Sequence, residues 1–247
     1  MRLRVGTSGY SYKEWRGTFY PEDLQPAEML RFYAERLGAV EINNTFYRMP
    51  SEKVLAGWAA QVPEDFRFAL KASRRITHFK RLKEAEEDLR YLTETALALG
   101  DRLGPVLFQL PPHLKLDRQR LETFVATLPQ EPRAAFEFRH SSWFVQEIYD
   151  LLREHGAALV TADTGEEGDA PLTATAGYGY LRLRRPDYDD ADLEAWVARV
   201  KEQPWEEALV FFKHEDEGAG PRLAARFRDL WEASPGSPAG AHVAPAE

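Results

Sequence analysis

Eight short apolar runs, most of them separated by stretches of helical periodicity, constrain the fold more than any other feature of this sequence. The runs are RVGTS, AVEIN, FRFALKA, VLFQLP, AAFEFRH, ALVTAD, GYLRLR and ALVFFKH, and each has the length of a buried strand. Strands that alternate with helices favour a parallel sheet, and a count of eight favours a closed α/β barrel of the TIM type, (β/α)8. An open doubly wound sheet is the alternative, but the GTSGYS turn lacks the glycine spacing of its phosphate-binding loop.

Most of the segments between these runs are predicted to form helices, and one connection is predicted to be a loop. Helical spacing of apolar residues, with capping residues at several ends, predicts helices over 26–37, 51–62, 83–103, 116–128, 145–155, 191–203 and 221–233. The sixth connection, 164–177, is rich in Gly, Asp, Glu and Thr, so we expect an irregular loop with a weak or missing helix. We therefore expect one barrel domain over residues 1–234 and a mobile tail of Pro, Gly, Ala and Ser over 235–247.

Composition narrows the function. The 247 residues include no cysteine, which excludes disulfides, thiolate metal sites and cysteine nucleophiles. The formal net charge of −8 opposes the wrapping of a long polyanion, so any binding of nucleic acid is expected to be weak and salt-dependent. No stretch approaches the roughly 20 apolar residues that span a bilayer, and no signal sequence opens the chain, so we expect a cytoplasmic protein without membrane contact.

Polar residues alternate with apolar ones along the predicted strands. Because the outer face of a barrel strand packs on apolar helices, the polar positions should point toward the barrel axis. This inward set consists of Glu41, Asn43, Lys71, Gln109, Glu137, Arg139, Asp163, Arg182 and Lys213. Most of these lie at the carboxyl end of their strand, where barrel enzymes carry their chemistry. Buried charges should also pair with one another, because an unpaired buried charge costs several kcal/mol, as an order of magnitude.

Several unusual stretches also carry a family resemblance. They are VGTSGYSYKEWRGTFYP, VEINNTFYRMPS, FRFALKASRRITH, GPVLFQLPP, AFEFRHSSW and TAD, which together run from Val5 to Asp163. On these residues the chain resembles the YecE-like family, also called domain of unknown function family 72. The resemblance implies a TIM-barrel fold and leaves the reaction open. The last third departs from the family pattern, with RLRRPDY at the seventh strand and FFKHEDEGAG at the eighth.

The inward set suggests a site for acid–base chemistry on an anion. Acid–base catalysis needs carboxylates in different environments, and we expect Glu137 to act as the base beside Arg139 and Glu41 to act as the acid. The candidate catalytic residues are Glu41, Glu137, Asp163 and Lys71. The candidate substrate-binding residues are Asn43, Tyr47, His78, Gln109, Arg139, Trp143, Arg182 and Lys213. No H-x-H or H-E-x-x-H spacing is present, so no metal ligand is assigned, and the sequence indicates no particular cofactor.

Three functions are compatible with this pattern. The first is a hydrolase, lyase or isomerase that acts on a small anionic, phosphorylated or sugar-like substrate. The second is a non-catalytic module that binds an anionic metabolite or a nucleic-acid backbone. The third is an interaction scaffold in which the inward charges form a structural salt-bridge network. A carboxylate with a raised pKa beside the cations would favour the enzyme, and full pairing of every charge would favour the scaffold.

Overall fold

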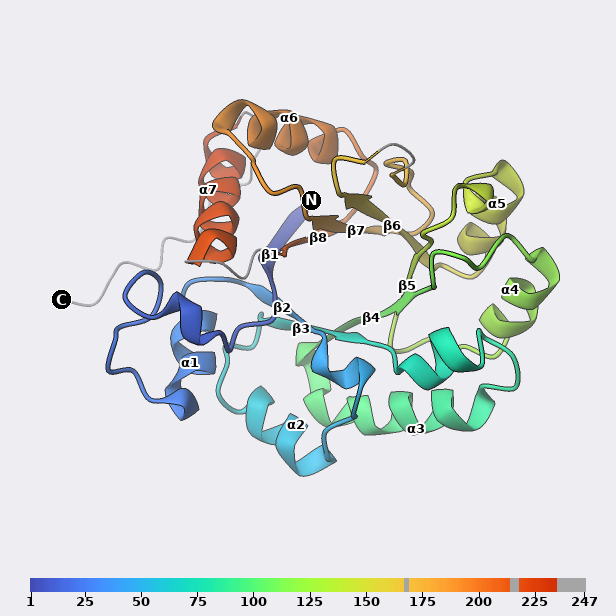
Figure 1. Ribbon diagram of the computed structural model, residues 1–247, viewed down its shortest axis with the longest axis horizontal. Helices are drawn as coiled ribbons and strands as arrows, with labels where there is room; N and C mark the ends of the chain where they lie inside the picture. The colour runs from blue at the N-terminus through green and yellow to red at the C-terminus, as the bar shows by residue number, and fades with distance from the viewer. Residues whose placement is uncertain (167–168, 214–217, 235–247) are drawn as a thin grey trace.

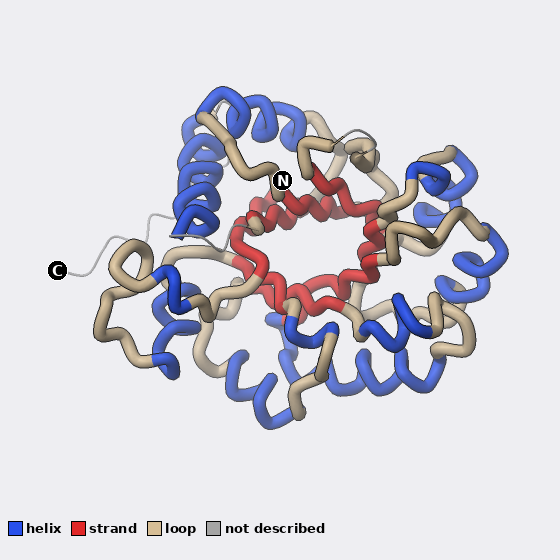
Figure 2. The backbone as a smooth tube through the Cα atoms, viewed as in Figure 1, coloured by secondary structure: helices blue, strands red, loops and turns tan. Residues whose placement is uncertain are grey.

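The computed structural model describes residues 1–166, 169–213 and 218–234, and eight of their segments form a closed parallel barrel (Figures 1 and 2). The strands are β1 (Arg2–Ser8), β2 (Ala39–Ile42), β3 (Arg67–Lys71), β4 (Leu103–Gln109), β5 (Ala134–Glu137), β6 (Ala158–Asp163), β7 (Tyr178–Leu183) and β8 (Glu207–Phe212). Each strand pairs with the next along the chain, and β8 pairs with β1 to close the ring. The prediction of a TIM-type barrel is therefore confirmed.

Helices surround the ring of strands, as Figure 2 shows. They are α1 (Met29–Ala34), α2 (Glu52–Ala59), α3 (Glu86–Ala96), α4 (Arg118–Val125), α5 (Gln146–Glu154), α6 (Asp190–Lys201) and α7 (Ala219–Ala233). In the described parts of the sixth connection, 164–166 and 169–177, no helix forms, which agrees with its loop-like composition. The predicted tail, 235–247, lies outside the described residues. Among the described helices, none is both long and apolar enough to cross a membrane.

Two apolar layers lie on either side of the strands. The outer layer packs strand residues such as Phe68, Phe136 and Phe212 against the helices. The inner layer fills the middle of the barrel with smaller or aromatic side chains, among them Ala69, Leu107 and Phe211. Because side chains on a strand alternate faces, these inner residues fix which positions point toward the barrel axis. Polar side chains of the same parity occupy the barrel above and below this apolar middle.

The first turn of the barrel is held by one buried tyrosine. The Tyr33 hydroxyl on α1 donates a hydrogen bond to the Ala39 carbonyl oxygen (2.8 Å) and accepts one from the Thr7 amide (2.8 Å). It therefore ties a helix to both β1 and β2. The strands approach closely here, since a methyl group at Gly6 would lie 1.8 Å from the Ala39 carbonyl oxygen. This contact aligns β1 with the start of β2, and the same register places Ser8 beside Glu41.

Candidate functional site at the carboxyl end of the barrel

A buried arginine from β7 joins two carboxylates from opposite sides of the barrel. Arg182 donates from Nη2 to Glu41 Oε1 (2.9 Å) and from Nη1 to Glu137 Oε2 (2.6 Å). All three side chains are at most 2% exposed. The pairing follows from the physics of burial, because a charge removed from water needs an opposite charge with good geometry. Arg139, which we expected beside Glu137 at a shared ligand, is exposed, and the cation that contacts Glu137 is Arg182.

Neutral donors complete this buried network. Glu41 accepts hydrogen bonds from the Ser8 hydroxyl (2.7 Å), the Asn43 amide (3.0 Å) and the Tyr180 hydroxyl (2.7 Å). Glu137 accepts one from the Gln109 side-chain amide (2.7 Å). Tyr180 escaped the sequence interpretation, although it precedes Arg182 by two positions and therefore shares its inward face. The same parity was the signal that could have found it.

These contacts keep both carboxyl groups in their ionised form. Burial alone would favour their protonated form, but the charge of Arg182 and the donated hydrogen bonds lower the pKa of Glu41 to about 2. The same causes, with Gln109 as donor, lower the pKa of Glu137. The two carboxylates in turn raise the pKa of Arg182 despite its burial. The expectation that Glu41 retains a proton and serves as the acid is therefore wrong, because Arg182 supplies the cation that its own strand lacks.

Four cations surround this network at the carboxyl ends of β3, β5, β7 and β8. We call these residues the mouth cations: they are Lys71, Arg139, Arg184 and Lys213. Within the described part of the chain, Lys71, Arg139 and Arg184 form no ion pair with a carboxylate. The Arg184 Nε atom is also buried without a hydrogen-bond partner there. The mouth therefore carries positive charge that the buried carboxylates do not neutralise by direct contact.

Burial and neighbouring positive charges lower the pKa of Lys71. Burial and the nearby charge of Arg182 lower the pKa of the Lys71 amine to about 8, against the opposing effect of Glu41 and Glu137. Lys213 adds to this lowering. The Lys71 Nζ atom lies 4.5 Å from the centre of the Phe46 ring. A lysine with such a pKa is partly deprotonated near neutral pH, whereas an ordinary surface lysine is almost fully protonated.

Two further predicted residues lie at the rim of the mouth. The His78 ring packs edge-on against Phe46, with 4.9 Å between ring centroids, and its Nδ1 is 2.9 Å from the Thr77 hydroxyl. Burial and the charges of Lys71, His113 and Arg139 lower the pKa of His78. Tyr47 is 67% exposed, and the Arg74 guanidinium lies 5.5 Å from the centre of its ring.

Two predicted site residues lie elsewhere. Asp163 points away from the barrel axis: its Oδ2 accepts hydrogen bonds from the Tyr188 hydroxyl (2.8 Å) and from Trp196 Nε1 (2.9 Å) on α6. The prediction that it points inward is wrong: Asp163 shares the outward face of β6 with Thr161, and Tyr188 and Trp196 supply hydrogen-bond donors there. Trp143 is fully buried outside the barrel, where it stacks on Phe138 and donates to the Leu114 carbonyl oxygen (2.7 Å). It therefore packs the outer layer and does not reach a ligand at the mouth.

A small cavity adjoins the network through one shared residue. The cavity measures about 290 Å³ and lies between the segments that follow β1 and β2 and helix α2. Its polar and aromatic lining includes Tyr10, Tyr12, Asn43, Asn44 and Trp58. The Asn43 amide also donates to Glu41, so it links the cavity to the buried network. Among the described residues, no three His, Asp or Glu side chains gather to hold a metal ion.

Comparison with known proteins places this geometry in a family. The family model for "Protein of unknown function DUF72" matches residues 4–246. The chain belongs to the DUF72 family. The crystal structure of a DUF72 protein, TM1631 from Thermotoga maritima MSB8, superposes with a TM-score of 0.82 at 30% identity and covers 94% of this chain and 100% of its own. A DUF72 protein from Enterococcus faecalis V583, ef0366, has a TM-score of 0.79 at 19% identity and covers 94% of this chain and 96% of its own, which shows the shared fold.

Two curated relatives of this DUF72 chain carry the family designation UPF0759. The protein YunF of Bacillus subtilis (strain 168) is 22% identical over 87% of this chain and 79% of its own length. The protein YecE of Escherichia coli (strain K12) is 30% identical over 55% of this chain, and the match spans about half of YecE, 52%. These relatives confirm the YecE-like family predicted from the sequence motifs.

Proposed function

We propose that this DUF72 protein is an enzyme that acts on a small anionic, phosphorylated or sugar-like substrate at the carboxyl end of its barrel. The observation that carries the proposal is that Lys71, Arg139 and Arg184 surround the buried pair of carboxylates and form no ion pair among the described residues. Lys71 and Arg184 are half-buried, so less water must be removed from them when they bind a phosphate or carboxylate. The position agrees with the general rule that barrel enzymes bind substrate at this end.

The adjoining cavity supports the sugar-like part of the proposal. Tyr10, Tyr12 and Trp58 supply aromatic surface, and the amides of Asn43 and Asn44 supply hydrogen-bond donors and acceptors. Aromatic faces with a few fixed polar groups suit a neutral ring that carries hydroxyl groups. A substrate would then place its ring near Asn43 and its anionic group among the mouth cations.

The roles proposed for Lys71 and for the two carboxylates differ. Glu41 and Glu137 stay ionised because Arg182 holds both, so their role is to fix Arg182 and the field around it. Lys71 has the titration range for proton transfer, since its pKa of about 8 lies close to neutral pH. We propose that Lys71 exchanges a proton with the substrate in a hydrolase, lyase or isomerase reaction, while Arg139 and Arg184 hold the anionic group.

Two other functions remain as candidates, and each has an observation in its favour. The complete pairing of Glu41, Arg182 and Glu137 favours a structural network, as an interaction scaffold would need. A binding module without catalysis would use the same mouth cations. Against the scaffold stands the position of Lys71, Arg139 and Arg184, because stability alone gives no reason to gather like charges without carboxylate partners in the described chain.

A thermal-shift screen against a library of phosphorylated and carboxylated metabolites tests the proposal, since a ligand that binds the folded state raises its melting temperature. We expect hits among sugar phosphates or sugar acids, and we expect Lys71→Met and Arg139→Gln to lose them. Arg90→Gln on α3, an exposed arginine in a helical ion pair, is the matched control. If the wild type converts a hit to product and Lys71→Met does not, the result supports an enzyme. Binding without turnover supports the binding module, and hits that survive both mouth variants contradict the proposed site.

A further inference from the structure

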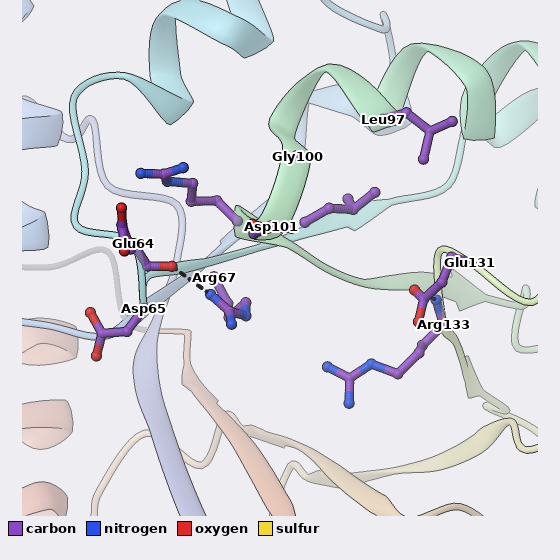
Figure 3. Close-up of a pocket in the computed structure, with 10 residues that line it drawn as sticks. Glu64, Asp65, Arg67, Leu97, Gly100, Asp101, Glu131 and Arg133 are labelled. Atoms are coloured by element: carbon purple, nitrogen blue, oxygen red, sulfur yellow. Dashed lines mark hydrogen bonds between the residues drawn. The ribbon is translucent and has the colours of Figure 1, made fainter.

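Two cavities lie at the amino end of the barrel, opposite the candidate site. They measure about 990 and 670 Å³, and both are lined by Arg67 and Arg133. Figure 3 shows the larger one, with Arg67 and Arg133 extending into the space from β3 and from the segment just before β5. This is the larger of the hollow regions described at the two ends of the barrel, and the proposed function makes no use of it.

Arginines and carboxylates gather together at the amino end of the barrel, but not every arginine there reaches a carboxylate among the described residues. Arg4 and Arg133 share one inward carboxylate: Glu207 accepts from Arg4 Nε (3.2 Å) and from Arg133 Nη2 (2.8 Å). Arg67 forms no ion pair within the described residues, and its Nη1 instead donates to the carbonyl oxygens of Glu64 (3.0 Å) and Phe66 (2.9 Å). Burial and the neighbouring charges of Arg4 and Arg133 lower the pKa of Arg67, against the effect of Glu207.

Several donors at this end also have no acceptor. In the described part of the chain, Arg4 Nη2 and Arg102 Nε are buried without a hydrogen-bond partner. Arg4 is 4% exposed, so this donor cannot be satisfied freely by bulk water. A buried donor without a partner costs about 1–3 kcal/mol, and a charged one costs more. Arg102 lines the larger cavity beside Arg67 and Arg133, so guanidinium groups from three segments lie around it.

We propose that the amino end of the barrel is a second binding site, for a compact phosphoryl dianion that Arg67, Arg102 and Arg133 hold together. Arginine suits this ligand because its planar fork of donors matches phosphate oxygens. The ligand must be compact. Glu64, Asp65, Asp101 and Glu131 are exposed around the same cavity and repel an extended polyanion such as a nucleic-acid backbone.

Barrel stability explains only part of this arrangement. Ion pairs at the amino end of a barrel are commonly structural, and the bonds of Glu207 to Arg4 and Arg133 fit that role. Arg67 and Arg102 do not, because neither reaches a carboxylate among the described residues, yet both face the same cavity. A phosphoryl group placed there would supply an acceptor for Arg102 Nε and an opposite charge for Arg67.

Calorimetric titration of the full chain with inorganic phosphate, inorganic pyrophosphate and glycerol 3-phosphate tests the proposal, at an ionic strength matched with sodium chloride. We expect saturable binding that Arg67→Gln and Arg102→Gln each weaken at least tenfold. Arg90→Gln is the control and should bind as the wild type does. Binding of the inorganic anions alone indicates a free phosphate ligand, and binding of the monoester as well indicates a phosphorylated metabolite.

Variants at each end of the barrel distinguish binding at the second site from binding at the mouth. Lys71→Met with Arg139→Gln removes the mouth site, so one binding event that depends on Arg67 should remain. If that event persists while the mouth variants lose nothing, the second site stands and the proposed function fails. Absence of saturable binding in the wild type overturns the second site. So does binding that both Arg67→Gln and Arg102→Gln retain unchanged, and the use of two variants guards against one that fails to fold.

Discussion

Arg182 is the residue on which the interior of the barrel mouth depends. It is the cation that both Glu41 and Glu137 contact, and it replaces the acid–base division expected from their neighbours in sequence. Its two carboxylate partners come from β2 and β5, so one side chain joins distant parts of the ring. The paired carboxylates thus hold Arg182 in place, whereas Lys71, Arg139 and Arg184 form no ion pair among the described residues.

Glu137→Gln should therefore act on stability. The change leaves Arg182 with one carboxylate, and breaking a buried ion pair in this way costs about 3 kcal/mol. We expect that loss in urea denaturation, with binding of any mouth ligand retained because the mouth cations are untouched. Glu122→Gln, which breaks an exposed helical pair with Arg118 on α4, is the control and should change stability by less than about 0.5 kcal/mol. Full stability with lost turnover would instead make Glu137 a catalytic base.

Lys71 should give the protein a stability that rises with pH in the alkaline range. Its pKa is about 8 in the folded chain and near its ordinary 10.5 when unfolded, so between these values the unfolded state binds more protons. Stability then increases as pH rises from about 8 toward 10.5. Lys71→Met removes this contribution.

The measurement is the difference in unfolding free energy between wild type and Lys71→Met at several pH values. We expect the unfolding free energy of the variant, minus that of the wild type, to be larger at pH 7 than at pH 10. This difference should shrink steadily as the pH rises. Lys53→Met, at an exposed lysine on α2, is the matched control. A difference for Lys71→Met that stays constant from pH 7.5 to 10 would show that the amine titrates as it does in the unfolded chain.

At the scale of elements, strand periodicity predicted the barrel and most of the inward positions. Glu41, Gln109, Glu137 and Arg182 all point inward as their parity indicated, because each alternates with apolar residues that pack on helices. The prediction for Asp163 was wrong because the polar face of β6, which carries Thr161 and Asp163, points outward. Trp196 on α6 supplies a hydrogen-bond donor on that side, so a polar residue need not point toward the barrel axis.

Partners across the barrel could not be predicted. Which strands face each other at the same height depends on the stagger of the closed sheet, and a single sequence does not report that stagger. Arg182 therefore reached Glu41 and Glu137, although Arg139 lies two residues from Glu137 in the chain. Trp143 failed for a related reason, since its short helical turn (Ser141–Trp143) folds back onto the outer layer.

The contact between β1 and β2 gives a prediction at this scale. Gly6→Ala places a methyl group 1.8 Å from the Ala39 carbonyl oxygen and 2.9 Å from the Tyr33 hydroxyl, and neither the strand nor Tyr33 has room to move. We expect a loss of about 3 kcal/mol or more, the upper end of the range for overpacking. Thermal and urea unfolding measure it.

Gly57→Ala is the matched control with the opposite sign. Gly57 lies within α2, and a methyl group there meets no atom within 4 Å. Alanine in a helix is favoured over glycine by about 0.5–1 kcal/mol, so this variant should be the more stable. Equal and small effects of the two substitutions would show that β1 and β2 can separate without cost.

At the scale of the whole molecule, charge is distributed by sign and by place. The chain carries a net charge of −8, yet cations gather at both ends of the barrel axis. Local cations attract a compact anion over a distance of about one Debye length, roughly 8 Å at physiological salt. The net negative charge of the surface repels larger anionic ligands, which extend beyond the cations. If the proposed sites are correct, we expect this arrangement to favour small anions over polymeric ones at both ends of the barrel.

Duplex DNA should therefore bind weakly. We expect a dissociation constant above about 1 µM at physiological salt, the range of non-specific association. If the backbone contacts Lys71, Arg139 and Arg184, three phosphates are neutralised, and raising salt from 50 to 200 mM should weaken binding about 40-fold. Fluorescence anisotropy of a labelled duplex measures both values, and Arg139→Gln should reduce the salt dependence by about one contact. Sub-micromolar affinity at physiological salt would show that the mouth cations outweigh the net charge, and it would favour a nucleic-acid backbone as the ligand of this end.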